Sequence, residues 1–286
     1  RGGKGLRGMV MKEEDTVMDT FVCSSHDYIL FFTSIGKVYW LKGYQKPQGS
    51  RTARGKPIIN MLPNLEEGEV LRSFITVSEF DKDRYLLFAT RNGIIKRTSL
   101  EAYSRPRSCG IWAISLREGD ELVQTQLCLE DHEAVLATAL GMANRFRVSD
   151  VRSMGRTATG VIGMRLKYDD DEVVSLAVFP AIGNGDDEPV DEEDETEADE
   201  EVDEELEETP GTKLLTITEN GFGKRALAGN YRLTRRGAAG VTNIRRQHIK
   251  ETGRVVKLML ERDDSELLLV SRNGMVIRTT SSCIRL

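Results

Sequence analysis

Hydrophobic and polar residues follow a pattern that recurs five times along the chain. In each copy an apolar run is followed by Thr or Ser, two further residues, a glycine and a short run that ends in or beside a base in all but the first copy. Three copies have Asn-Gly at the turn, which is a strong hairpin signal between two β-type runs. Each copy therefore predicts a β-hairpin, and its nearly all-apolar first strand is expected to be covered on both faces. The copies are Tyr28–Trp40, Tyr85–Arg97, Ala134–Phe146, Leu214–Arg225 and Leu267–Arg278.

A basic, glycine-containing loop follows the hairpins at a nearly constant distance. The loop glycines are spaced 50, 55, 50 and 80 residues apart, starting in an initial partial repeat, and they are Gly5, Gly55, Gly110, Gly160 and Gly240. An acidic turn and another strand come next. About four strands in each 50 residues, without helical periodicity, predict an all-β fold of blades, either a propeller or its hairpin-swapped relative. The repeats are expected at residues 1–26 (partial), 27–80, 83–130, 132–180, 212–262 and 265–286 (partial), which suggests a piece of a longer chain.

Acidic residues are concentrated in one segment. The chain has 40 Lys and Arg against 46 Asp and Glu, a net charge of −6, but 17 of these acids lie between Asp186 and Glu208, where there is no base. The rest of the chain therefore carries a net charge of +11. The like charges, together with Pro189 and Pro210, predict a disordered acidic insertion over residues 184–210 between two blades.

Candidate catalytic chemistry is sparse. His26, His132 and His248 are scattered without the spacing of metal ligands, and the sequence has neither a G-x-S-x-G motif nor a phosphate-binding loop. No apolar run approaches the roughly 20 residues that span a bilayer. We therefore expect no catalytic residue, no metal site, no cofactor and no membrane segment.

Positive charge does recur at equivalent positions. If the blades close into a ring, bases after the hairpin glycines and in the basic loops would form a belt around one edge. Glycines in these loops would let backbone N–H groups approach phosphates, as suits a surface that follows a curved DNA duplex without reading its bases. The expected rim residues are Arg7, Arg51, Arg54, Lys56, Lys96, Arg97, Arg105, Arg107, Arg145, Arg147, Arg152, Arg156, Lys224, Arg225, Arg235, Arg236 and Arg278.

The first five residues, Arg1, Gly2, Gly3, Lys4 and Gly5, carry a more specific signal. This RGGKG segment resembles the core of the Q-R-R-G-G-K-G box of the C-terminal DNA-wrapping domain of the bacterial DNA gyrase A protein. The initial Gln and first Arg of that box would precede residue 1. Segments such as Met154–Val161 and Thr218–Arg225 are similar to the same family. The resemblance implies a six-bladed β-pinwheel, with hairpins exchanged between neighbouring blades and incomplete first and last blades here.

The resemblance also implies a role. Family members wrap double-stranded DNA around the rim without sequence specificity, anchored by the box, and thereby support ATP-dependent negative supercoiling by DNA gyrase, a type IIA topoisomerase. The implied partners are the gyrase A N-terminal domain, as a homodimer, and gyrase B in an A2B2 heterotetramer. ATP and Mg²⁺ would be used by other parts of that enzyme, in the bacterial cytoplasm at the nucleoid.

Two other identities and two roles for the insertion stay open at this point. The corresponding C-terminal domain of topoisomerase IV is similar, although its box is degraded, and the intact RGGKG favours gyrase. A propeller scaffold for protein partners, of the regulator of chromosome condensation type, also has repeats near 50 residues. The acidic insertion is either a tolerated inter-blade loop or a polyanion that competes with DNA for the basic rim.

Overall fold

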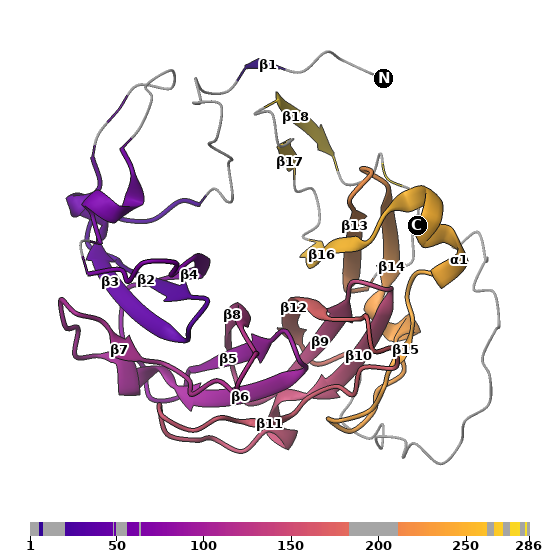
Figure 1. Ribbon diagram of the computed structural model, residues 1–286, viewed down its shortest axis with the longest axis horizontal. Helices are drawn as coiled ribbons and strands as arrows, with labels where there is room; N and C mark the ends of the chain where they lie inside the picture. The colour runs from indigo at the N-terminus through magenta and orange to yellow at the C-terminus, as the bar shows by residue number, and fades with distance from the viewer. Residues whose placement is uncertain are drawn as a thin grey trace.

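Antiparallel sheets, each built on one of the predicted hairpins, form the fold (Figure 1). The computed structural model describes residues 6–7, 21–47, 49, 56–62, 64–182, 211–261, 266–270, 275–280 and 284, and within them there are five sheets. The hairpins, in chain order, are β2 (Tyr28–Thr33) with β3 (Lys37–Lys42), β5 (Tyr85–Thr90) with β6 (Ile94–Ser99), β9 (His132–Thr138) with β10 (Met142–Arg147), β13 (Lys213–Thr218) with β14 (Gly223–Leu227), and β17 (Glu266–Val270) with β18 (Met275–Thr280).

An inner strand pairs with the first strand of each of the first four hairpins. These strands are β4 (Leu71–Val77), β8 (Leu122–Cys128), β12 (Val173–Pro180) and β16 (Val255–Glu261). Neighbouring inner strands contact one another, β4 with β8, β8 with β12 and β12 with β16, so the sheets are arranged radially as blades around a centre (Figure 1).

The outer strand of a blade comes from the following repeat. After the second hairpin the chain runs back to the first blade, where β7 (Ile111–Trp112) pairs with β3. In the same way β11 (Val161–Ile162) pairs with β6, and β15 (Val241–Thr242) pairs with β10. This exchange between neighbouring blades is the pinwheel arrangement that the sequence resemblance implied, and the all-β fold class is confirmed.

The two partial repeats at the ends share one sheet. The short strand β1 (Leu6–Arg7) pairs with β18, with Leu6 opposite Val276, and β18 pairs with β17. Among the described residues, the four whole repeats and the two halves therefore give five blades, where the resemblance implied six for the parent domain.

The core lies between the blades. Leu30, Phe32, Phe88 and Tyr103 pack between the first and second blades, and Leu87, Leu136, Phe146 and Leu176 pack between the second and third. The strands β2, β5 and β9 are buried along almost their whole length, which explains why their sequences are apolar on both faces. Each such fully buried Leu or Phe contributes about 1.5–3 kcal/mol to folding.

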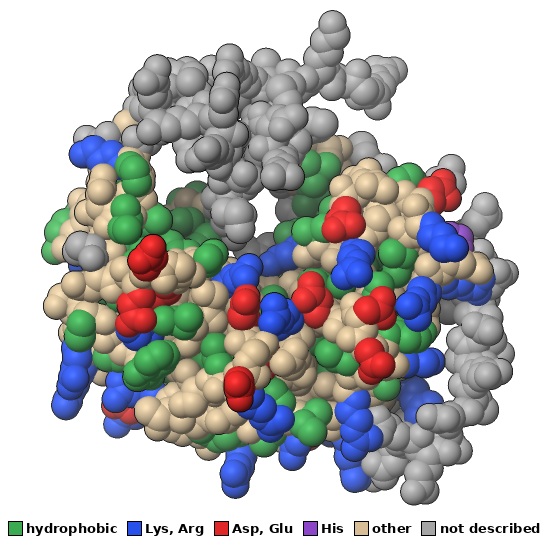
Figure 2. All heavy atoms as spheres, viewed as in Figure 1, with side chains coloured by type: hydrophobic (Ala, Val, Ile, Leu, Met, Phe, Trp, Pro, Cys, Tyr) green, Lys and Arg blue, Asp and Glu red, His purple; other side chains and the backbone are tan. Residues whose placement is uncertain are grey.

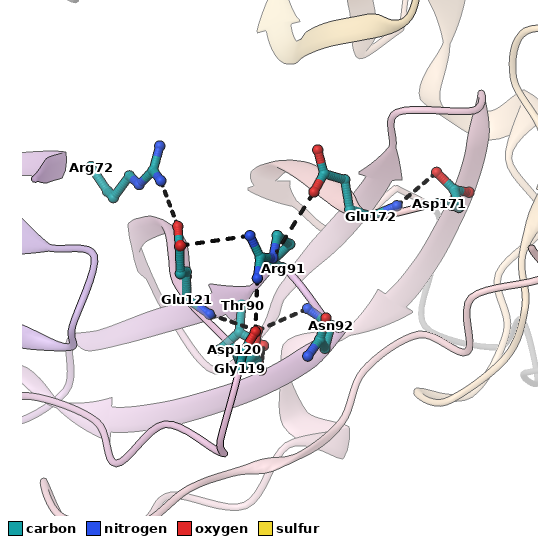
Figure 3. A network of polar contacts seen from close by, with 9 residues as sticks. All are labelled: Arg72, Thr90, Arg91, Asn92, Gly119, Asp120, Glu121, Asp171 and Glu172. Carbon is teal, nitrogen blue, oxygen red and sulfur yellow. Dashed lines mark hydrogen bonds and ion pairs between the residues drawn. The ribbon is translucent and has the colours of Figure 1, made fainter. Parts of the chain in front are cut away.

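The recurrent Thr has a structural role at the hairpin turn, as the second and third hairpins show. Thr90 Oγ1 accepts a hydrogen bond from the Ile94 amide (3.1 Å), and Thr138 Oγ1 accepts one from the Met142 amide (3.1 Å). The acidic turns join this arrangement, because Asp120 accepts bonds from the Thr90 hydroxyl (2.6 Å) and from the Asn92 amide (3.0 Å; Figure 3). Asp120 is therefore buried as a cap of the hairpin turn.

Ion pairs link neighbouring blades on the side of the molecule where the acidic turn of Asp120 lies (Figure 3). Arg72 of β4 contacts Glu121 at 2.5 Å, and Arg91 lies 3.6 Å from Glu121 and 4.0 Å from Glu172. Arg91 also donates a hydrogen bond to the Gly119 carbonyl (2.7 Å). The first three blades are therefore linked through partly exposed charges next to the inner strands.

In the described part, each 3₁₀ turn except η2 directly follows the second strand of a hairpin. The 3₁₀ turns are η1 (Gly43–Gln45), η2 (Ile58–Asn60), η3 (Leu100–Tyr103), η4 (Val148–Asp150) and η5 (Ala228–Asn230). One α-helix lies in the described part, α1 (Arg246–Thr252), although the sequence showed no helical periodicity. No helix in the described part is long and apolar enough to cross a membrane. The predicted acidic insertion, 184–210, falls outside the described residues.

Candidate nucleic-acid interface

Three basic segments run along the outer edge of the blades, and we call them the rim loops: residues 104–117, 152–167 and 231–245. Each lies on the second hairpin strand of the preceding blade. Near the start of the second rim loop the Met154 amide bonds to the Arg97 carbonyl (2.8 Å), and near the start of the third the Thr234 amide bonds to the Arg145 carbonyl (2.9 Å). Each then continues into its outer strand, so the loops are fixed along their length.

Glycine allows this close approach. Gly160 has a φ of +105°, and a Cβ there would lie 2.4 Å from the Ile95 carbonyl oxygen; at Gly240 the corresponding distance to the Ala143 oxygen is 2.3 Å. We expected these glycines to admit phosphates. The structure gives them a different role, which is to let the loop backbone pack directly on the hairpin.

Consecutive rim loops are hydrogen-bonded to each other. The Ser115 amide of the first loop bonds to the Ala158 carbonyl of the second (3.2 Å). Between the second and third loops, the Gly237 amide bonds to the Gly163 carbonyl (2.8 Å). The three loops therefore form one continuous band across three blades rather than separate projections.

Exposed bases lie along this band. In Figure 2, Lys and Arg side chains project from the outer edge, while most Asp and Glu on the visible face lie nearer the centre. Many of the predicted bases are exposed, and Arg147 is half-buried. The exposed ones are Lys56, Arg105, Arg107, Arg152, Arg156, Lys224, Arg235, Arg236 and Arg278.

Further bases on the rim loops were not among the predicted residues. Arg117 and Lys167 are exposed and lie seven residues after the loop glycines Gly110 and Gly160. Arg165 is exposed just after β11. The constant distance from the loop glycine was the signal in the sequence that would have identified the first two.

Four predicted bases are buried instead of lying on the exposed edge: Lys96, Arg97, Arg145 and Arg225. Arg145 shows the reason. Its guanidinium bonds to the Glu133 carboxylate on the neighbouring strand (2.8 Å from Nε) and to the carbonyl of Tyr231 (3.0 Å), just after η5. The side chain therefore ties the third blade to the segment that follows the fourth hairpin.

The same position makes the same link in other blades. Arg225 forms two hydrogen bonds with Glu261 (2.8 and 2.9 Å) and a third with the Ile284 carbonyl (3.3 Å). Trp40, which broke the pattern of bases, donates its indole N–H to the Tyr103 carbonyl (3.1 Å), just as Arg145 donates to Tyr231. We call Trp40, Arg145 and Arg225 the inter-blade clamps. Their recurrence arises because these blade junctions need a long N–H donor at this point.

A carboxylate lies within the basic band. Arg236 Nε donates to the Asp150 carbonyl (3.1 Å), and Arg147, Arg235 and Arg236 all lie close enough to act on the Asp150 carboxyl. Burial raises the pKa of that carboxyl, and the three guanidiniums oppose the rise. The cluster joins the end of β10 to the third rim loop and concentrates positive charge there.

Several predicted residues are not covered. The box residues Arg1, Gly2, Gly3, Lys4 and Gly5, and the loop residues Arg51 and Arg54, lie outside the described residues, and Arg7 is placed only as backbone in β1. Among the described residues, no three His, Cys, Asp or Glu side chains are grouped as metal ligands would be.

Comparison with known proteins identifies the family. The model of the DNA gyrase C-terminal domain, beta-propeller, matches residues 1–24, 27–78, 84–128, 132–180, 212–260 and 265–285. The DNA gyrase A protein of Chlamydia muridarum is 38% identical over 287 residues, which cover 100% of this chain and 31% of that protein. The chain thus spans less than a third of that relative.

Two solved structures share the fold. A DNA gyrase A C-terminal domain has a TM-score of 0.74 at 24% identity, covering 99% of this chain and 82% of the other. The C-terminal domain of a DNA topoisomerase IV has a TM-score of 0.69 at 22% identity, covering 92% and 72%. The exchanged blades and the match along nearly the whole chain lead to one conclusion: this chain belongs to the DNA gyrase C-terminal domain family.

Proposed function

We propose that the chain binds double-stranded DNA without sequence preference and wraps it along the rim loops. The observation that carries the proposal is the band of exposed Lys and Arg on loops that are hydrogen-bonded end to end across three blades. A continuous curved line of bases matches the repeated phosphates of a bent duplex, and backbone contacts of this kind need no base readout.

The proposed contacts exclude Lys96, Arg97, Arg145 and Arg225, whose side chains are buried. They include the exposed rim bases, with the box Arg1–Gly5 as the proposed anchor of the wrap. Phosphate contacts of this type release counterions, so each one lost reduces the slope of log K against log salt by about 0.9.

Within a whole enzyme, we propose that the wrap presents DNA for strand passage by DNA gyrase and so supports ATP-dependent negative supercoiling. The partners would be the gyrase A N-terminal domain, as a homodimer, and gyrase B in an A2B2 assembly in the bacterial cytoplasm. Cleavage, ATP hydrolysis and Mg²⁺ would belong to those parts, leaving this chain without a cofactor of its own. The corresponding part of a topoisomerase IV is the second candidate, supported by the similar fold match.

Binding measurements with loop variants test the proposal. Affinity for a mixed-sequence duplex should fall about 10³-fold or more between 50 and 200 mM salt if at least six phosphates are contacted. Arg152→Ala with Arg156→Ala should reduce the salt slope by about 2. The control is Lys82→Ala, an exposed lysine (78% exposed side chain) that is paired with Glu101 and is not part of a rim loop.

A topology assay separates wrapping from simple binding. A nicked circle is ligated with the chain bound, and the sign of the trapped writhe is read after deproteinisation. Positive writhe is expected, and writhe indistinguishable from that of protein-free circles would refute wrapping. Affinity that is insensitive to salt would refute the phosphate contacts and favour a scaffold for protein partners.

A further inference from the structure

A fully buried lysine lies beneath the junction of the first two rim loops. Lys96 of β6 has no exposed surface, and its ammonium donates hydrogen bonds to the carbonyls of Ala113 and Arg156 (2.6 Å for the latter). Ala113 belongs to the first rim loop and Arg156 to the second. One buried side chain is thus hydrogen-bonded to both loops.

The surroundings of Lys96 are unusual for an ammonium. Its Nζ lies 5.2 Å from the centre of the Phe88 ring, and the Tyr103 hydroxyl also donates to the Ala113 carbonyl (3.1 Å). Burial, with a smaller contribution from the charge of Arg156, lowers the pKa of Lys96 to about 7. A polar group held in such a site at a desolvation cost indicates that its two hydrogen bonds matter to the arrangement.

At the junction of the second and third rim loops, a different buried residue makes the same kind of bridge. Asn144 lies three residues after Gly141, as Lys96 lies three after Gly93, and it is also fully buried. Its Nδ2 donates to the Gly163 carbonyl of the second rim loop (3.0 Å), and its Oδ1 accepts from the Thr234 hydroxyl of the third (2.5 Å).

Both side chains therefore bridge the two sides of a loop junction. The loops meet above them through the direct bonds Ser115–Ala158 and Gly163–Gly237. The Ser115 hydroxyl adds a bond to the Thr157 carbonyl at the first junction, and the Arg165 amide and the Arg236 guanidinium add bonds at the second. All of these bonds join loop to loop, whereas each bridging side chain ties both loops to the hairpin strand that carries it.

We propose that Lys96 and Asn144 are positioning residues that fix the offset between consecutive rim loops, and thereby the curvature of the path that wrapped DNA follows. The inference rests on the proposed wrapping function. Neither side chain reaches DNA, so each acts through the loop backbone. Loss of a bridge removes none of the exposed bases but lets the loops that carry them shift. Shifts of about 1 Å are enough to degrade a site that depends on geometry.

The test measures the affinity for a DNA duplex and the trapped writhe separately, using the 286-residue chain. Lys96→Met keeps the length of the side chain and removes its donors, and Lys82→Met is the matched change at an exposed lysine. Duplex affinity at 50 mM salt should stay within about twofold of the unchanged chain because the phosphate contacts remain. Writhe trapped at saturating protein should fall by about half in Lys96→Met and stay unchanged in Lys82→Met.

Hydrogen exchange provides a second readout that does not depend on DNA. In Lys96→Met, amides of residues 113–117 and 154–158 should exchange at least about tenfold faster, while amides of 234–238 keep their rate. Unchanged exchange and unchanged writhe would overturn the proposal, and so would affinity and writhe that fall in proportion. If wild type binds no DNA, the proposed function fails, yet the exchange measurement still decides whether Lys96 positions the loops.

Asn144→Leu repeats the test at the next junction and decides the matter if Lys96→Met does not fold. In Asn144→Leu, faster hydrogen exchange should be confined to residues 163–165 and 234–238, where the second and third rim loops meet. Trapped writhe should again be reduced while the affinity for the duplex is retained. Exchange that increases uniformly along the chain in Asn144→Leu would indicate general loosening and would count against a positioning role.

Discussion

The clamp made by Arg145 offers the sharpest test of what the recurrent hairpin bases do. Methionine at this position fills much of the same space but provides no donor. It leaves the carboxylate of Glu133 buried and uncompensated, since that side chain is 3% exposed. It also removes the donor to the Tyr231 carbonyl. Removing one partner of a buried ion pair costs about 3–5 kcal/mol, which is the loss of unfolding free energy expected for Arg145→Met.

Arg97 provides a matched comparison at the same position of the preceding blade. Its guanidinium is equally buried, but its partner Glu130 is 62% exposed and remains solvated when the arginine is removed. We therefore expect Arg97→Met to cost no more than about 2 kcal/mol. The paired change Arg145→Met with Glu133→Leu should recover at least about 2 kcal/mol relative to Arg145→Met, because no buried charge is then left alone.

Guanidinium chloride unfolding followed by circular dichroism measures all three variants, with duplex affinity measured in parallel. A clamp predicts a large difference in stability and unchanged affinity in the variants that fold. Equal costs for Arg145→Met and Arg97→Met would refute the reasoning about the buried carboxylate. A reduced salt slope of DNA binding in Arg145→Met would show that this arginine reaches phosphate after all.

Three further predictions concern single sites. The pKa of Lys96 is about 7 in the folded chain and 10.5 ordinarily, so between these pH values the unfolded chain binds more protons than the folded one. The free energy of unfolding, compared with that of Lys96→Met, should therefore rise by about 2 kcal/mol from pH 7 to 9. Denaturant titrations that show a fall over this range would contradict this. Gly160→Ala should cost at least about 2 kcal/mol by thermal melting, whereas Gly155→Ala, with open space around its Cβ, should change stability by no more than about 0.5 kcal/mol. Trp112, 49% exposed on the outer strand β7, should be shielded from iodide quenching when duplex is added, while half-buried Trp40 should change little.

Sequence patterns predicted the hairpins well because their signals are local. An apolar run, a Thr and a turn glycine lie within about ten residues, and each contributes to the same turn, as Thr90 and its bond to Ile94 show. The outer strands had no such signal. Ile111–Trp112 is two residues long, and its partner β3 lies some 70 residues earlier in the chain. Only the family resemblance predicted that exchange.

The candidate site was predicted less well, for a physical reason. Recurrence shows that residues occupy equivalent positions in each blade, but it does not show whether those positions face water. Arg145 and Arg156 both recur, yet Arg145 is buried against a carboxylate and Arg156 is exposed. The acid that distinguishes them, Glu133, lies on the adjacent strand and becomes meaningful only when the strands are paired.

The exchange of outer strands means that the unit copied in the sequence differs from the unit that folds. A cut between sequence repeats separates a blade from its outer strand, and a cut between hairpin and rim loop separates the hairpin from its inner strand as well. Deleting residues 83–130, for example, would remove a hairpin and also β7, which completes the first blade. Removing this repeat alone would thus leave the edge of β3 unpaired unless an outer strand from another repeat takes the place of β7, and an unpaired sheet edge is a site for pairing with other chains.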